Sequence, residues 1–223
     1  MEWLQGRSGR QKIYFRLGGV ENKMMVNPLK ILTKIIVLIN LAAVFSFAAE
    51  APELPVIEKA ADFKLINQDN QEITLSQLLG KVKVVTFIYI RCHQAMVCPL
   101  TTKNLKKLQD SLKGSLDKRT VILSISFDAE FDTPGMLKKY AQLYDVDFHN
   151  WHFLTGDKAA IEKACQDYKF IAEKGEDRIF RHSAITFLID QNNNIRKIYF
   201  SNLWAPEEIK RDIMALLSNE NTA

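Results

Sequence analysis

Two cysteines close together in the sequence are the residues best suited to chemistry. Cys92 and Cys98 are separated by five residues, and Pro99 directly follows the second cysteine. Because thiolates are nucleophiles, redox partners and ligands for soft metals, the pair predicts disulfide exchange or metal binding. A structural disulfide, or two buried thiols, is the plain alternative.

The segments on either side of this pair predict a strand followed by a helix. Residues 82–90 are mostly apolar and β-branched, as in a strand buried on both faces. Proline is favoured at the first helical position, so Pro99 predicts a helix start with Cys98 as the N-cap. Since backbone N–H groups and the helix dipole stabilise a thiolate there, we expect a lowered pKa for Cys98.

The spacing of the cysteines differs from the redox motif Cys-x-x-Cys. Five intervening residues make a loop, which lets both sulfurs point at a common third atom. Two soft thiolates suit Cu(I) or Zn(II), and a third ligand would complete a trigonal site. His182 is the best third candidate, because it precedes the strand predicted at 185–189, and in a thioredoxin-like layout the loop before that strand faces the dithiol.

Other residues with suitable chemistry have a plain interpretation beside the functional one. His93 and Met96 lie within the cysteine loop, where each could bind copper or simply occupy the surface. His149 and His152 flank a tryptophan at the edge of a short strand, which favours a structural or solvated state. Cys165 falls on the core face of a predicted helix, where a small buried thiol is common.

Two carboxylates follow the second predicted central strand. Asp132 precedes a Thr-Pro pair, so we interpret it as the N-cap of the next helix. Asp128 is a candidate neighbour of the cysteine site.

The order of the predicted elements indicates the fold class. Helix-forming segments alternate with strands after residue 82, and a hairpin with a turn at 190–194 precedes the last helix. Strands are predicted at 62–67, 71–75, 82–90, 120–127, 151–154, 185–189 and 195–200, and helices at about 100–112, 132–144, 158–168 and 206–217. This order predicts an α/β protein with a thioredoxin-like fold, in which helices flank a central mixed β-sheet.

The basic residues are concentrated in the amino-terminal part of the 223-residue chain. Residues 1–48 hold seven Lys and Arg and two acids, so 49–223 carry a net charge of −1 and give no support for binding nucleic acid. Residues 24–48 resemble a secretory signal peptide or an N-terminal membrane anchor. We expect 1–23 to be an upstream extension from a misassigned start, 49–60 a linker, and 61–219 the thioredoxin-like domain of an exported, periplasmic or membrane-anchored protein.

Several stretches together resemble the Sco/SenC family of thioredoxin-like copper chaperones. The similar stretches are 89–92 with 98–100, 126–134, 151–156, His182 with 189–190, and 204–208. The resemblance implies a copper site of Cys92, Cys98 and His182. We expect Cu(I) there because thiolates are soft ligands, and Cu(II) stays open as a second form. It also implies delivery of copper to the binuclear centre of a cytochrome c oxidase, with another exported copper protein as a further candidate. Because cysteines outside the cytoplasm tend to oxidise, we also expect a thiol reductant as a partner. The family's usual motif has three residues between its cysteines, so this chain resembles a divergent branch.

Two alternatives to the copper chaperone stay open. The first is a dedicated thiol-disulfide reductase for an oxidase subunit, with Cys92 and Cys98 as its redox pair, and the second is a domain with a structural disulfide. Peroxiredoxin chemistry lacks support, because Tyr89 and Ala95 stand where a threonine would precede the attacking cysteine. Ile185 replaces the proline that a general thioredoxin carries before the corresponding strand. We therefore expect a protein that is not a classical enzyme.

Overall fold

The structure is a computed structural model that describes residues 16–17, 20–21, 54–92, 97–175 and 180–218. The chain divides into two compact units, Met1–Ala51 and Pro52–Ala223. In the first unit, Arg16–Leu17 (β1) pairs antiparallel with Val20–Glu21 (β2). The second unit contains the predicted thioredoxin-like domain.

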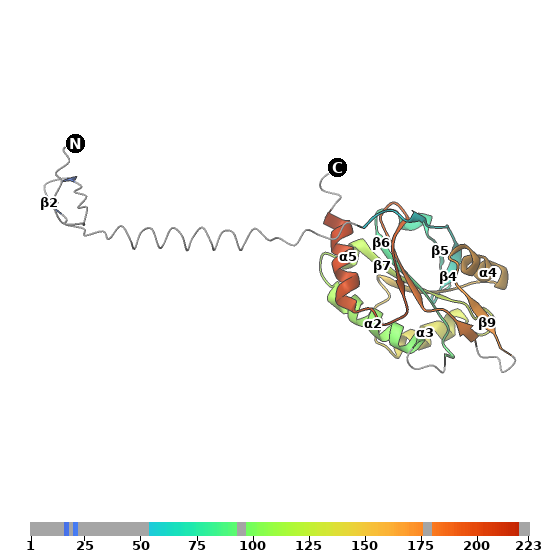
Figure 1. The fold of residues 1–223 in the computed structure, drawn as a ribbon. Helices are drawn as coiled ribbons and strands as arrows, with labels where there is room; N and C mark the ends of the chain where they lie inside the picture. Colours follow the sequence, from blue (N-terminus) through green and yellow to red (C-terminus); the bar gives the residue numbers. More distant parts are fainter. Residues whose placement is uncertain (1–15, 18–19, 22–53, 93–96, 176–179, 219–223) are drawn as a thin grey trace. The chain divides into compact units, whose positions relative to one another are not determined.

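A mixed eight-stranded sheet forms the centre of the second unit (Figure 1). Its strands are β3 (Glu58–Lys59), β4 (Lys64–Asn67), β5 (Glu72–Thr74), β6 (Val82–Ile88), β7 (Thr120–Ser126), β8 (Trp151–Thr155), β11 (Ile185–Ile189) and β12 (Asn194–Phe200). The order is β3-β12-β11-β6-β7-β8-β4-β5. Strands β6, β7 and β8 are parallel, and the other pairs are antiparallel. Every residue of β6 and β7 is buried, which agrees with their apolar and β-branched sequences.

Helices cover the sheet and begin where proline and capping residues allow. They are α2 (Cys98–Ser111), α3 (Pro134–Gln142), α4 (Lys158–Asp167) and α5 (Pro206–Ser218), with 3-10 turns η1 (Ser76–Leu78) and η2 (Asp117–Arg119). Helices α2 and α5 pack side by side, and α4 lies across the strands from them in Figure 1. None of the helices in the described ranges is long and apolar enough to span a membrane. The predicted α/β fold with a mixed sheet and flanking helices is confirmed.

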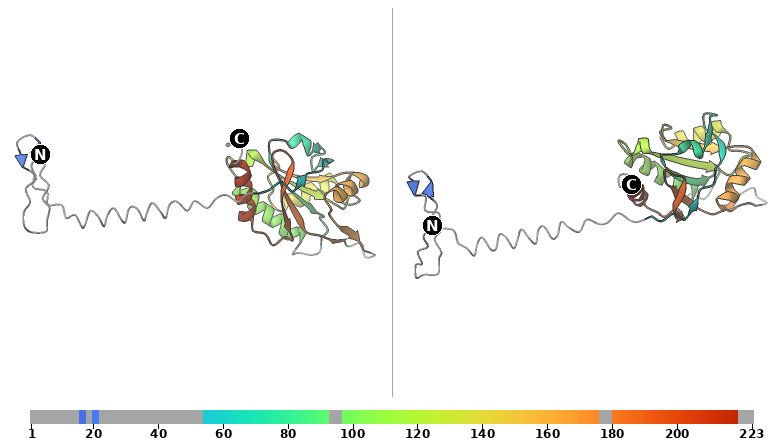
Figure 2. Two further views of the ribbon diagram at one scale, coloured as in Figure 1. Left: turned by 45° about the horizontal axis from the view of Figure 1, so that its top comes forward. Right: turned by 90° about the horizontal axis from the view of Figure 1, so that it is seen from above.

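A two-stranded hairpin separate from the main sheet was not predicted. It consists of β9 (Ala172–Lys174) and β10 (Phe180–His182), paired antiparallel at the rim of the domain (Figure 2). The prediction that His182 lies in a loop was therefore wrong, because this residue ends strand β10. The hairpin escaped prediction since three residues per strand are too few to show an alternating pattern.

The compact unit includes residues that the sequence analysis assigned to a linker. Strand β3 pairs with β12, and Leu54 and Ala60 are buried in the core. The predicted boundary at residue 61 is thus too late. The rest of the predicted linker and the predicted signal peptide lie outside the described residues.

Candidate metal centre

The two cysteines enter the site from the end of β6 and the start of α2. Cys92 follows β6 in a tight turn, and its N–H donates to the Tyr89 carbonyl at 3.3 Å. Cys98 is the first residue of α2 and Val97 is the N-cap, so Pro99 occupies the second helical position. The prediction that Cys98 caps this helix was wrong by one residue. All three cysteines of the chain lie in the described part and are thiols.

The structure brings together the three predicted ligands. The Sγ atoms of Cys92 and Cys98 lie 3.8 and 3.9 Å from His182 Nε2, and all three atoms lie within 4.8 Å of one another. Among the described residues, this is the one group of three or more His, Cys, Asp or Glu side chains with such convergence. The three donors therefore come from β10, the α2 start and the turn after β6.

The spacing of these donors fits a metal ion. A metal bonded to sulfur at about 2.3 Å and to imidazole nitrogen at about 2.0 Å with trigonal angles separates those two atoms by about 3.7 Å. The two observed sulfur–nitrogen distances, 3.8 and 3.9 Å, are close to that value. Two thiolates with one imidazole are a donor set that suits soft ions such as Cu(I) and also Zn(II).

His182 is held with one particular nitrogen toward the sulfurs. Its Nδ1 lies 2.8 Å from the Ser183 carbonyl, so Nδ1 carries the proton and Nε2 presents its lone pair to the thiols. The rings of Tyr89, Phe127 and Phe170 pack around the imidazole, with centroid distances of 5.6, 5.1 and 6.3 Å. This apolar surround fixes the ring orientation without competing for its lone pair.

The electrostatics of the site differ from the expectation for Cys98. A hydrogen bond with Cys92 and then burial raise the pKa of the Cys98 thiol, although its backbone position at a helix start favours the thiolate. Burial disfavours the charged form of His182, but hydrogen bonds to Cys92 and to the Ser183 carbonyl outweigh it and raise the pKa of His182. The predicted low pKa of Cys98 was therefore wrong for the metal-free dithiol.

Asp132 does not cap a helix. The cap of α3 is Thr133, whose hydroxyl accepts from the Met136 N–H, while Asp132 is fully buried. Its Oδ2 accepts hydrogen bonds from the Ile90 N–H at 3.1 Å and from Ser126 Oγ at 2.6 Å. Asp132 therefore holds the chain just ahead of the cysteine turn.

Asp128 pairs with the residue directly before Cys92. Its buried carboxylate accepts from Arg91 Nη2 at 2.6 Å, and Arg91 also lies 4.0 Å from the centroid of the Phe131 ring. Because Arg91 directly precedes Cys92, this ion pair fixes the entry to the turn. Sequence analysis missed Arg91 because nothing in its surroundings distinguishes it from a solvated arginine.

The remaining candidates fall outside the triad. His93 and Met96 lie outside the described residues. Cys165 is half-buried on α4, and burial raises its pKa to about 11. His152 is half-buried on β8, and burial lowers its pKa.

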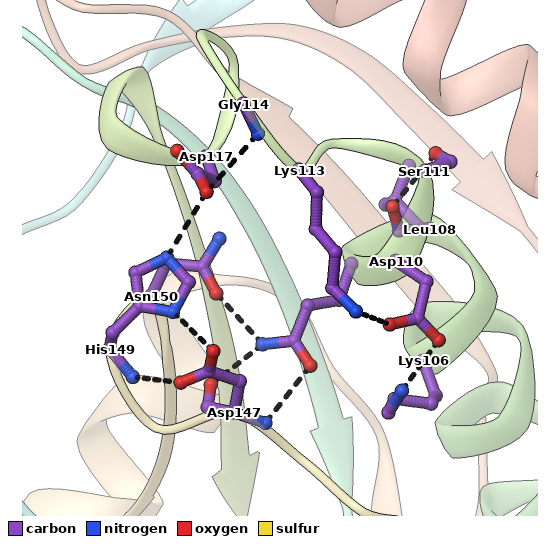
Figure 3. Close-up of polar contacts among 11 residues, drawn as sticks. Lys106, Leu108, Asp110, Ser111, Lys113, Gly114, Asp117, Asp147, His149 and Asn150 are labelled. Carbon is purple, nitrogen blue, oxygen red and sulfur yellow. Dashed lines mark hydrogen bonds and ion pairs between the residues drawn. The ribbon is translucent and has the colours of Figure 1, made fainter.

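His149 belongs to a polar cluster that includes Asp117 and Asp147 (Figure 3). Its Nδ1 lies 2.9 Å from the Asp147 carboxylate. Gln109, near the carboxyl end of α2, bonds to the backbone carbonyl of the same aspartate and to Asn150. His149 is thus a partly exposed member of this cluster, which agrees with the structural or solvated state predicted for it.

The fold and the three converging donors define a thioredoxin-like domain with a dithiol–imidazole group whose geometry suits a metal ion. The family model described as SCO1/SenC matches residues 53–218, so the chain belongs to the SCO1/SenC family. The predicted family resemblance is confirmed.

Similar proteins give the same assignment. The chain is 35% identical over 150 residues to a protein named "SCO1 protein homolog" from Bacillus subtilis, covering 65% of this chain and 75% of the relative. A solved structure of BsSco, described as a member of the Sco family of cytochrome c oxidase assembly proteins, is 29% identical, with a TM-score of 0.64 over 74% of this chain and 98% of that one. A structure of Bradyrhizobium japonicum ScoI with copper bound is 25% identical, with a TM-score of 0.62 over 71% of this chain and 99% of that one.

Proposed function

We propose that this protein binds one copper ion through Cys92, Cys98 and His182. The observation that carries the proposal is the convergence of two thiols and one oriented imidazole nitrogen at distances that suit a three-coordinate ion. The copper-bound structure of a Sco relative supports copper as that ion. Thiolate sulfur favours Cu(I) among the ions available to such a site.

We propose further that the copper is cargo, which the protein passes to an exported copper protein. The membership of BsSco in a family of cytochrome c oxidase assembly proteins supports the binuclear copper centre of such an oxidase as the destination. A three-coordinate ion leaves room for an incoming ligand, so exchange can proceed through a shared intermediate. The segment 24–48 supports export to the periplasm, as a free or membrane-anchored protein, where a thiol reductant would keep the dithiol reduced.

The reductase alternative has less support. An attacking cysteine needs an accessible thiolate with a lowered pKa. Cys98 is only 1% exposed and its pKa is raised, because it shares a hydrogen bond with Cys92 and is buried. The arrangement suits a metal site better than an attack on a partner's disulfide.

The proposal predicts a copper stoichiometry of one that depends on all three ligands. The reduced protein is titrated with Cu(I) against a competing chelator under anaerobic conditions, beside Cys98→Ser and His182→Ala. Removal of one ligand is expected to weaken binding by two orders of magnitude or more. Cys165→Ser removes the thiol that lies outside the triad and should bind copper like the unchanged protein.

Two outcomes would contradict the proposal. Equal affinity in Cys98→Ser, or a loss in Cys165→Ser, would place the copper elsewhere. A reduced protein that binds no Cu(I), with a dithiol potential in the range of catalytic disulfides, would favour the reductase instead.

Delivery is tested by mixing the copper-loaded protein with the copper-free soluble domain of an oxidase subunit. Transfer of copper is followed by the absorption spectrum of the binuclear centre.

A further inference from the structure

The hydroxyl group of Tyr89 is a buried polar group that the proposed copper ligands do not explain. Tyr89 directly follows β6 and is only 2% exposed. Its oxygen is buried and forms no hydrogen bond of normal geometry with any described residue. Most buried hydroxyl groups in proteins have a partner, so an exception needs a physical reason.

Packing alone does not account for this oxygen. The ring contacts Phe127 at 5.0 Å and Phe180 at 5.3 Å between centroids, and it meets the His182 ring edge to face. A phenylalanine would supply all of these ring contacts. It would also avoid the free-energy cost of burying a hydroxyl without a hydrogen bond.

The surroundings of the hydroxyl point to the dithiol. The polar groups near the hydroxyl are the Cys92 side chain and the Phe180 backbone. The Tyr89 ring also meets the ring of His182, whose Nε2 lies 3.8 Å from the Cys92 sulfur. The Cys92 N–H donates to the Tyr89 carbonyl at 3.3 Å, so the tight turn keeps the two residues in contact. A buried O–H donor therefore lies beside a sulfur that becomes negatively charged when it binds a metal.

We propose that the Tyr89 hydroxyl is a positioning group for the copper site, which donates a hydrogen bond to the Cys92 sulfur when that sulfur is a metal-bound thiolate. This inference rests on the proposed copper binding. A hydrogen bond to a coordinated thiolate withdraws electron density from the sulfur and stabilises its charge. The hydroxyl therefore has a hydrogen-bond partner in the copper-loaded protein. In the metal-free protein it lacks that partner, which lowers the stability of this form.

The test compares Tyr89→Phe with a control that removes another buried tyrosine hydroxyl. Tyr168 is 4% exposed, and its hydroxyl donates to the Ala61 carbonyl at 2.9 Å. Three properties are measured for each variant: Cu(I) affinity by chelator competition, the sulfur-to-Cu(II) charge-transfer band, and the Tm of the metal-free protein.

Tyr89→Phe is expected to weaken Cu(I) binding about 10-fold, as loss of an outer hydrogen bond to a ligand does in other metal sites. Its charge-transfer band should move to longer wavelength, because the sulfur electrons rise in energy without the hydrogen bond. The Tm of metal-free Tyr89→Phe should equal or exceed that of the unchanged protein. Tyr168→Phe should do the opposite, with a lower Tm and an unchanged affinity and band.

The inference is overturned if the unchanged protein binds copper and Tyr89→Phe retains both its affinity and its band position. It is also overturned if Tyr89→Phe lowers the Tm as Tyr168→Phe does, since the hydroxyl would then be structural. If the unchanged protein binds no copper, the proposed function is contradicted and this inference with it. The two failures are distinguishable, because failure of this inference alone requires an unchanged protein that binds copper.

Discussion

Asp132 is a buried carboxyl group that supports the cysteine turn without touching a ligand. Its Oδ2 accepts two hydrogen bonds, whereas its Oδ1 is buried without a partner among the described residues. Burial raises the pKa of Asp132 to about 6, and the hydrogen bonds to Ser126 and Ile90 oppose that rise only in part. Below about pH 6 this buried carboxyl group therefore holds a proton.

The raised pKa predicts how stability changes with pH. The folded protein holds a proton on Asp132 between pH 4 and 6 that the unfolded chain has released, so this contribution to stability is present below pH 4 and is lost as pH rises through about 6. The loss amounts to about 2–3 kcal/mol at about 1.4 kcal/mol per pKa unit. Urea unfolding of the metal-free protein at several pH values, compared with Asp132→Asn, measures it.

The asparagine in that variant would keep an oxygen acceptor for the Ile90 N–H but would not titrate. The free energy of unfolding of the unchanged protein should therefore fall relative to that of Asp132→Asn between pH 4 and 7. Parallel pH profiles for the two proteins would show that Asp132 has an ordinary pKa.

The hairpin of β9 and β10 is the element that presents His182 to the thiols. It is not hydrogen-bonded as a strand to the main sheet, and Phe180 is its buried anchor, with ring contacts to Tyr89 and Phe127. An exposed ion pair, 2.6 Å between Lys174 Nζ and Glu130 Oε2, also links the hairpin to the rest of the domain. The anchoring of this element therefore depends mainly on one aromatic side chain.

Phe180→Ala is predicted to weaken copper binding more than it weakens the domain. Truncation of a buried phenylalanine costs about 3–5 kcal/mol where the surroundings stay folded, and here the hairpin can open locally instead. A smaller fraction of molecules then holds His182 in place, so the apparent Kd for Cu(I) should rise at least about 10-fold. Chelator competition measures the affinity, and hydrogen exchange at residues 172–174 measures the opening.

Lys174→Ala is the matched control on the same hairpin. Exposed ion pairs contribute less than about 1 kcal/mol, so this variant should change the apparent Kd less than about 5-fold. An equal loss of affinity in both variants, or no loss in Phe180→Ala, would contradict the anchoring by Phe180.

The elements that sequence alone predicted are those with a long, uniform pattern. Strands β6, β7 and β11 are runs of apolar and β-branched residues, and helix α5 has a clear apolar face, so each was predicted within one or two residues. Strands β3, β9 and β10 contain two or three residues with polar side chains among them. They form because the folded chain offers them a partner strand, which no local pattern shows.

The convergence of Cys92, Cys98 and His182 could be predicted from the sequence, but the pKa values of these groups could not. His182 was placed near the dithiol because the order of strands decides which loop ends face each other, even though its own strand was missed. The pKa of Cys98 depends on how close Cys92 lies and how much water is excluded, and both are known only from the folded structure. In the sequence, both Asp132 and Thr133 are suitable N-cap residues. Thr133 is the N-cap because Pro134, directly after it, occupies the first helical position.

At the scale of the whole molecule, the predicted signal peptide or anchor at 24–48, the leader, predicts where the protein works. The basic residues Lys30 and Lys34 precede an apolar stretch at 35–47, followed by a small-x-small pattern at 46–48. Expression of the full chain in a bacterial host should give a periplasmic protein, and mass spectrometry of its amino terminus should find a start near Ala49. A membrane-bound product with the leader intact would identify an anchor in place of a cleaved signal.

A charge within the apolar stretch is the control for export. Leu38→Asp should keep the protein in the cytoplasm with its leader uncut, because a carboxylate there is costly to move into the membrane. Full-length protein in the cytoplasm without that substitution would contradict export.

The distance between the ligands along the chain has a consequence for the order of events in the cell. His182 lies 90 and 84 residues from the two cysteines that it faces, so the three donors meet only after β6, α2 and the hairpin have come together. A chain that crosses a membrane unfolded cannot carry a metal held in this way. If the protein is exported unfolded, as we propose, loading with copper follows translocation and folding, and the compartment that supplies the ion is the one in which the protein folds.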